Sequence, residues 1–189
     1  MKNNNEGFTL VEILIVVAII AALVAIAIPV ISKQVEKANE AYDIATMRQA
    51  ASLSVEFYYD GVVDNASAEA HGLKWWDNHN ANQDNAAGVY DPATGEFLPI
   101  SSKDSTLAYG KGTEVDGGTV FEWGDDRTAY KADLDYRNAV VMVAIYPTGD
   151  NKHIDVYWKY SKGAAKAGQY VGGQEGNNNP KYSIRIELE

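Results

Sequence analysis

The chain has 189 residues, which is enough for one membrane-spanning helix and one modest globular domain. It contains no cysteine, which excludes a disulfide scaffold, a thiolate metal site and a cysteine nucleophile. The formal net charge is −10, and the part from Asp60 onward carries 12 Lys and Arg against 20 Asp and Glu. Because an acidic surface repels nucleic acid, we expect no nucleic-acid partner.

An uncharged run of 19 residues, Ile13 to Ile31, lies near the start of the chain. As a helix it is about 28 Å long, close to the ~30 Å hydrocarbon core of a bilayer. Glu12 is the only ionisable side chain between Phe8 and Ile31. Because a carboxylate in such a segment costs free energy, the sequence predicts a membrane helix in which Glu12 has a role and a partner.

Two ordinary interpretations of this run stay open at this point. A secretory signal has a basic start, an apolar stretch of about 7–15 residues and an A-x-A-like cut site. Ala25-Ile26-Ala27 matches that site, although the apolar stretch is already long before it and Glu12 lies inside it. A plain uncleaved anchor needs neither Glu12 nor a glycine such as Gly7 at its entry.

The start of the chain also resembles the type IV pilin family, which includes the pseudopilins. The shared pattern is a short polar leader that ends in glycine, then an F-T-L-V-E sequence, then about 20 apolar residues. Here it comprises the leader 1–7 with Gly7, followed by Phe8 to Glu12, and Pro29 stands where many members bend the helix. The match covers about the first 50 residues, with Ala21 where many members have glycine and with Lys2 as the only lysine of the leader.

The resemblance implies processing and assembly through these residues. A prepilin peptidase would cut between Gly7 and Phe8, and the new amino terminus at Phe8 would be N-methylated. Glu12 of one subunit would then pair with the Phe8 amine of a neighbour in a helical homo-oligomeric filament. The bland alternative for Glu12 is a carboxylate that snorkels to the membrane surface without a partner. For Pro29, a bend that helps filament packing and a proline tolerated in any membrane helix stay equally open.

The resemblance further implies a cellular route for the protein. The precursor would lie in the inner, cytoplasmic membrane, and a pilus assembly platform would build the mature subunits into an extracellular surface filament.

The helix is expected to continue well beyond the apolar run. No glycine or proline occurs from Ser32 to Tyr58, and the first stop signal is Asp60-Gly61. Two sets of residues follow the 3–4 spacing of a helix face, namely Val35, Ala38, Tyr42 and Ala45, and Ala50, Leu53 and Phe57. We therefore divide the chain into a leader (1–7), a transmembrane and filament-core helix (8–31), an amphipathic continuation (32–59) and a globular head (60–189).

The head is predicted to be rich in strands only in its second half. Residues 60–120 resemble an irregular connector, apart from a short candidate strand at Thr119 to Trp123. Asn138 to Tyr146 and His153 to Tyr160 form a predicted hairpin, and Tyr182 to Leu188 alternates as a last strand. The predicted fold class is α+β, with one long helix packed on an antiparallel sheet of about four strands.

Signs of chemistry are sparse in the head. The histidines His71, His79 and His153 share no motif, and the loop around His79 lacks the glycine and glutamate of an EF-hand. Asp125, Asp126, Asp133 and Asp135 form an acidic cluster that we interpret as solvated. We expect no catalytic, metal or cofactor site and no enzyme activity. Three tryptophans, Trp75, Trp76 and Trp158, are interpreted as lids of the core, with sugar stacking as the alternative if they are exposed.

The function that the sequence favours is a structural subunit, the major pilin, of an extracellular type IV pilus that supports adhesion, twitching motility or aggregation. A pseudopilin of a type II secretion or DNA-uptake machine shares every N-terminal feature and stays open. A third alternative, from a different class, is an adhesin or glycan-binding head that uses a pilin stem only for export.

The first prediction concerns the mature chain. Gly7-Phe8 is the one junction with a small residue at the entry to the apolar run and Glu12 close behind. The intact mass of the extracellular protein should therefore equal that of residues 8–189 plus one methyl group. A chain that begins at Ile28 would instead show ordinary signal-peptidase cleavage after Ala27.

Overall fold

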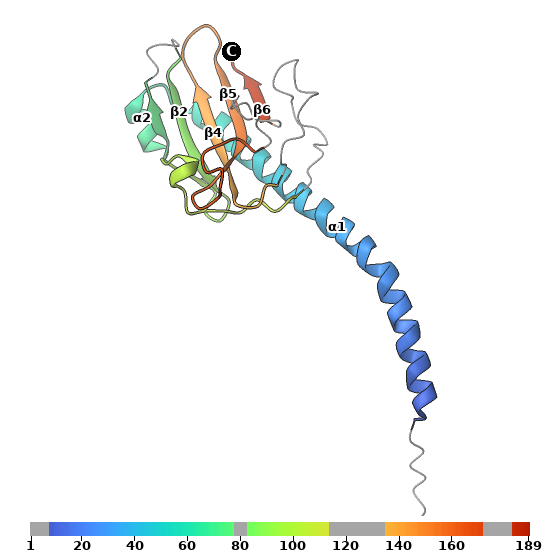
Figure 1. Ribbon diagram of the computed structural model, residues 1–189. Helices are drawn as coiled ribbons and strands as arrows, with labels where there is room; N and C mark the ends of the chain where they lie inside the picture. The colour runs from blue at the N-terminus through green and yellow to red at the C-terminus, as the bar shows by residue number, and fades with distance from the viewer. Residues whose placement is uncertain (1–7, 78–82, 114–134, 172–182) are drawn as a thin grey trace, which may run out of the picture. The chain divides into compact units, whose positions relative to one another are not determined.

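The computed structural model describes residues 8–77, 83–113, 135–171 and 183–189 (Figure 1). The chain divides into two compact units, Met1–Ala38 and Asn39–Glu189, and each is described here by itself. Helix α1, Leu10–Tyr59, belongs to both, and all the strands belong to the second unit, which we call the head.

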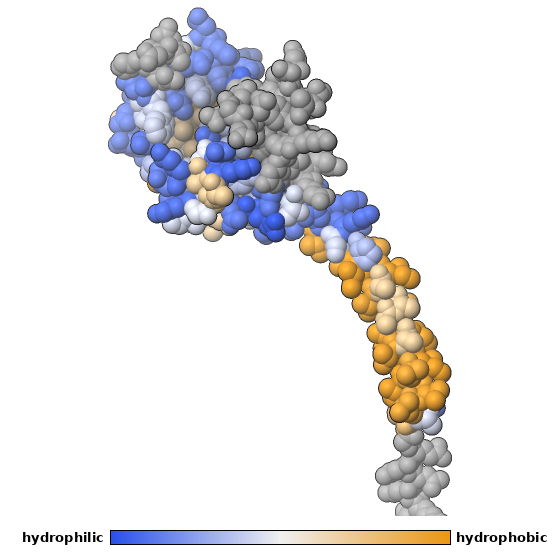
Figure 2. Space-filling model, in the orientation of Figure 1, coloured by the Kyte–Doolittle hydropathy of each residue, from blue (hydrophilic) through white to orange (hydrophobic). Residues whose placement is uncertain are grey.

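Helix α1 confirms the predicted long helix. It runs for 50 residues and ends where the sequence signal placed its stop, because Gly61 adopts a left-handed conformation with φ of 91°. In the first unit its apolar side chains are exposed on every side, and none of the residues in its most apolar window is buried. Among the described residues, α1 is the one helix that is both long enough and apolar enough to cross a membrane. Figure 2 shows its apolar segment as hydrophobic on the visible face.

Inside the head, α1 buries part of the face that apolar spacing predicts, together with polar residues that this spacing does not count. Ala50 is buried, and Leu53 and Phe57 pack against the core, whereas Ala45 is exposed. The fully buried stripe combines small and polar residues at helical spacing: Asp43, Thr46, Met47, Ala50, Ala51 and Ser54. Periodicity counts apolar side chains and therefore misses the polar members of this stripe.

Those polar members have identifiable partners. The hydroxyls of Thr46 and Ser54 donate to backbone carbonyls one turn earlier, at 2.9 and 2.6 Å. Asp43 is only 2% exposed, and its carboxylate accepts backbone N–H bonds from Lys111 and Gly112 at 2.8–3.0 Å. The Lys111 ammonium also lies 3.6 Å from the centroid of the Tyr42 ring. The buried carboxylate thus fastens a loop of the head to α1.

The described residues of the head form one antiparallel sheet of six strands rather than about four. The strands follow the order β1-β2-β4-β5-β6, and β3 pairs with the last three residues of β2. The elements are α2 (Asn65–Ala70), β1 (Lys74–Trp76), β2 (Asn85–Asp91), β3 (Glu96–Leu98), the 3₁₀ helix η1 (Ser102–Asp104), β4 (Ala139–Tyr146), β5 (His153–Tyr160) and β6 (Ser183–Glu187). The fold class, a long helix and an antiparallel sheet, is confirmed, as are the three C-terminal strands.

The predicted irregular connector is wrong in part, because it contains α2 and the strands β1, β2 and β3. The first four residues of strand β2 are Asn, two Ala and Gly, which have low strand propensity, so its signal is weak. Packing explains the choice of glycine at Gly88, where a Cβ atom would lie 2.8 Å from the carbonyl oxygen of Leu98. The candidate strand at Thr119 to Trp123 lies outside the described residues.

The sheet has two differently covered faces, set by strand alternation. Side chains such as Val143, Ile145 and Val156 form a core with Met47 and Ala50 of α1. Side chains on the other face, including Val140, Met142 and Tyr157, form a second cluster under the loops that follow β3 and β5. We call this second side the outer face of the sheet.

A buried polar cluster lies on the outer face near β6. The ring of His153 stacks on Tyr146 with 4.4 Å between centroids, and its Nε2 lies 3.5 Å from an oxygen of Asp155. Asp155 accepts two hydrogen bonds from the Arg185 guanidinium, each 2.8 Å. Burial on its own lowers the pKa of His153, but the hydrogen bonds to Asp155 and to the Asn151 carbonyl outweigh it, so the pKa is raised.

The second prediction follows from this raised pKa. Because the folded-state pKa of His153 exceeds that of the unfolded chain, its charged form stabilises the head fully below about pH 6.5, and the contribution is lost as the pH rises through the folded-state pKa. The urea midpoint of the wild type, minus that of His153→Gln, should decrease as the pH is raised from about 5.5 to about 8. Tryptophan fluorescence of the full chain in detergent measures it.

The control for this experiment is His71→Gln, because His71 is a partly exposed histidine elsewhere in the head. This variant should keep the pH dependence of the wild type. If His153→Gln keeps it as well, the buried cluster is not its source.

Candidate processing and assembly site at the start of α1

The first turn of α1 is closed by a reciprocal pair of side chains. Thr9 precedes the helix, and Glu12 is its third residue. The Glu12 carboxylate accepts hydrogen bonds from the backbone N–H and the hydroxyl of Thr9, both at 2.8 Å. The Glu12 N–H in turn donates to the Thr9 hydroxyl at 3.3 Å. This is a capping box, in which a threonine and a glutamate satisfy helix-start donors for each other.

The capping box gives Glu12 a partner that sequence analysis missed. The signal was present, because a threonine followed three residues later by a glutamate, directly before an apolar run, is the pattern of such a box. Both bonds from Thr9 end on the same carboxylate oxygen, Oε2. The second oxygen, Oε1, faces no donor among the described residues and is therefore free to accept from another chain. Glu12 is thus oriented from within its own helix while it remains able to bind outward.

The residues around this turn are accessible. Phe8 is 84% exposed, and Gly7 lies outside the described residues. The cleavage at Gly7-Phe8, the methylation of Phe8 and the pairing of the Phe8 amine with Glu12 therefore stay predictions. The box is compatible with all three, since none of its bonds involves Phe8.

Pro29 does not interrupt the helix, because α1 is continuous through it. A bend of the helix at this position stays a prediction. One turn further on, the Ser32 hydroxyl donates to the carbonyl of Ile28 at 2.9 Å, an internal bond that often accompanies helix bending.

The apolar surface of α1 that follows the capping box is exposed and available for contact with other molecules. Its large side chains are exposed all around the helix, with representatives at Leu14, Val17, Leu23 and Ile28. Exposed apolar surface of this extent is not stable in water and needs lipid or other helices to cover it. The segment is therefore suited to lie in a bilayer or against other apolar helices.

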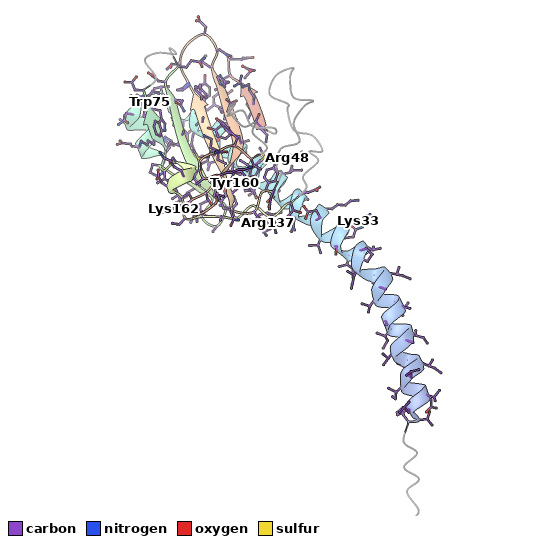
Figure 3. The ribbon with its side chains drawn as sticks, viewed as in Figure 1. Lys33, Arg48, Trp75, Arg137, Tyr160 and Lys162 are labelled. Carbon is purple, nitrogen blue, oxygen red and sulfur yellow. The ribbon has the colours of Figure 1, made fainter. Side chains whose placement is uncertain are left out.

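The head gives little support for a second site at the positions that sequence analysis considered. Trp158 is only 2% exposed, and Trp75, which lies beside α2 in Figure 3, packs on the core, so both are confirmed as core residues. Trp76, in contrast, is 45% exposed. His79 and the acidic residues Asp125, Asp126 and Asp133 lie outside the described residues, while Asp135 holds the Arg137 guanidinium. Within the described ranges no three His, Asp or Glu side chains come together as a metal site.

Comparison with known proteins agrees with the N-terminal geometry. A family model described as the prokaryotic N-terminal methylation motif matches residues 2–28. Fimbrial protein EcpC of Eikenella corrodens is 30% identical over 149 residues, which cover 74% of this chain and 95% of that protein. No solved structure matches the chain significantly.

The third prediction separates the two roles of Glu12. Glu12→Gln keeps the capping box, because glutamine also serves at this position, but it removes the charge. Thr9→Ala removes the box, at a cost of about 1 kcal/mol to the helix, and keeps the charge. If charge pairing drives assembly, Glu12→Gln and Glu12→Ala should strongly reduce surface filaments, whereas Thr9→Ala should retain most of them.

The measurement is the ratio of sheared surface protein to membrane-inserted protein for each variant. All three variants should insert normally, because none adds a charge to the helix. Wild-type assembly of Glu12→Gln together with loss of assembly in Thr9→Ala would show that the glutamate acts only as a helix cap.

Proposed function

The chain belongs to the type IV pilin family, and from this premise we propose that it is the major structural subunit of an extracellular type IV pilus. Family membership implies processing by a prepilin peptidase and assembly into a homo-oligomeric filament. It also implies a membrane-anchored precursor that becomes part of a surface filament. The name of the similar fimbrial protein supports a pilus subunit over a component of a secretion machine.

One observation carries the proposal, namely the long helix whose apolar side chains are exposed on all sides and whose first turn holds a single oriented carboxylate. Burial of apolar surface contributes roughly 25 cal/mol per Å², so helices that pack side by side along this segment gain much stabilisation from contact alone. Contact between apolar helices leaves their axial register weakly fixed, since one turn resembles the next. A pair between the Oε1 atom of Glu12 and a cationic amine at Phe8 of a neighbour fixes that register.

The role proposed for the head is structural, without catalysis or a cofactor. It covers one face of its sheet with α1 and keeps a polar surface, as the visible face in Figure 2 illustrates. The net charge of −10 keeps such a crowded subunit soluble. Cleavage at Gly7-Phe8, docking on a pilus assembly platform and a final location on the cell surface complete the proposed route. Support of adhesion, twitching motility or aggregation is the proposed outcome for the cell.

The alternative, a pseudopilin, uses the same N-terminal segment and differs in amount and location. A pseudopilin stays mostly within the cell envelope, and a major pilin dominates the material that shearing removes from cells. The name of the similar protein, the extended apolar helix and the absence of a recognised catalytic motif are compatible with both, and the fimbrial name favours the pilin.

The fourth prediction tests this choice. In material sheared from the cell surface, the mature chain should be the most abundant protein by mass spectrometry. Deletion of its gene should remove the visible filaments, and re-expression should restore them. A control with Glu12→Ala should return the protein to the membrane fraction. Filaments that persist without this chain, with secretion or DNA uptake lost instead, would contradict the proposal and favour the pseudopilin.

A further inference from the structure

A pocket of about 470 Å³ lies on the outer face of the sheet, on the side away from the α1 core. Strand register explains which side chains meet there. Trp76 pairs with Asn85, Met142 pairs with Tyr157, and Val140 pairs with Lys159, so alternation directs these side chains to one face. The residues Ser101, Ser102 and Lys103 around η1 and Gly168 after β5 close its border. The volume is that of a small-molecule site.

The pocket presents an aromatic side chain and polar side chains. Trp76 is 45% exposed at its border, and the Lys74 ammonium lies 4.4 Å from the centroid of the indole. Ser102 and Asn85 also line the pocket and carry groups that can hydrogen-bond to a ligand. The pocket therefore combines an aromatic surface with polar groups, as small-molecule sites commonly do.

A half-enclosed cation lies on the floor of the pocket. The Lys159 ammonium lies 4.2 Å from the centroid of Tyr170 and 5.6 Å from that of Tyr157. Burial lowers its pKa, and none of the ion pairs formed by the described residues involves it. The aromatic rings compensate part of its charge. An acidic chain has many carboxylates available, yet this ammonium is left to face the pocket, together with the exposed Lys103.

We propose that this pocket binds a small acidic sugar, one that carries a carboxylate on a pyranose ring. The carboxylate would contact Lys159 and Lys103, and the apolar face of the ring would lie against Trp76. The hydroxyls of the sugar would bond to Ser102 and to Asn85 in the lining of the pocket. This inference concerns the head alone and does not rest on the filament proposal.

Both components of the ligand are needed to account for the pocket. A simple anion would satisfy the two lysines but would leave the indole and the polar groups of Ser102 and Asn85 unused. A neutral sugar would use those groups but would leave the Lys159 ammonium without a counter-charge. An acidic sugar matches both sets of groups within one pocket.

The fifth prediction tests this site with the full mature chain in a non-ionic polyoxyethylene detergent, which carries no sugar. Isothermal titration with glucuronate and with N-acetylneuraminate should show saturable binding to one site. Glucose, N-acetylglucosamine and acetate should bind at least about tenfold more weakly, because each lacks one component of the ligand. Raising the salt concentration should weaken the binding of the acidic sugars.

Three variants and one control locate the binding. Lys159→Met, Lys103→Gln and Trp76→Ala should each weaken binding by roughly tenfold. Lys103 and Trp76 are exposed, so their substitution tests the site even if Lys159→Met disturbs the fold. Lys162→Gln is the matched control, because this exposed lysine lies in the loop after β5 without lining the pocket (Figure 3). It should bind like the wild type.

Several results would overturn the proposal. Acetate that binds as tightly as glucuronate would reduce the pocket to an anion site, and glucose that binds as tightly would remove the role of Lys159. An equal loss of affinity in Lys162→Gln would show that general surface charge causes the binding. Absence of saturable binding of both acidic sugars to the folded wild-type protein would also contradict it.

Discussion

The structure depends on one helix that must satisfy two different environments. Over its first part, α1 is apolar on all sides, and within the head only a stripe around Met47 and Ala50 is buried. The first part is stable only in lipid or against other helices, while the second holds the sheet. Because both parts belong to one continuous helix, covering the apolar part in an assembly leaves each head attached to that assembly. The helix therefore ties the position of the head to whatever covers the apolar part.

The Glu12 carboxylate at the start of this helix acts together with Thr9, which caps the first turn. A charged side chain in an apolar bundle loses hydration, and rotamer freedom adds to the cost of pairing it. Thr9 removes part of that freedom, since it holds one oxygen of Glu12 by two hydrogen bonds and leaves the other available. The same bonds satisfy donors of the first helical turn, which would otherwise be unpaired in lipid. Capping is therefore compatible with the subunit pairing that we propose for the same side chain.

The parts predicted correctly from the sequence are those with strong local signals. Helix α1 has a long uninterrupted pattern with a glycine stop, and β4 and β5 are apolar or alternating around a turn. The polar members of the buried stripe of α1 were missed, because the partners of Asp43 and Ser54 become visible only in three dimensions. Strand β2 was missed because its alanines and glycine are chosen for close packing. Thr9 could have been found from its spacing to Glu12, whereas the outer-face pocket could not, since separate strands and loops form it.

The two faces of the sheet differ in use, because the inner face packs on α1 and the outer face holds the pocket for which we propose a ligand. The inner face is committed to α1, so its side chains must remain apolar and closely packed. Among the described residues the outer face is covered by loops and the short η1 rather than by an α-helix, and there the chain holds polar groups that a fully covered sheet would exclude, among them Asp155 and Lys159. Asp155 is neutralised by Arg185 within the head, whereas Lys159 faces a pocket and, among the described residues, has aromatic rings rather than a carboxylate beside it. A half-enclosed charge without a counter-charge is costly to keep, and a ligand that supplies the counter-charge recovers part of that cost on binding. A filament repeats each head along its length, so even weak binding by a single pocket becomes strong attachment to a surface that carries many copies of the ligand.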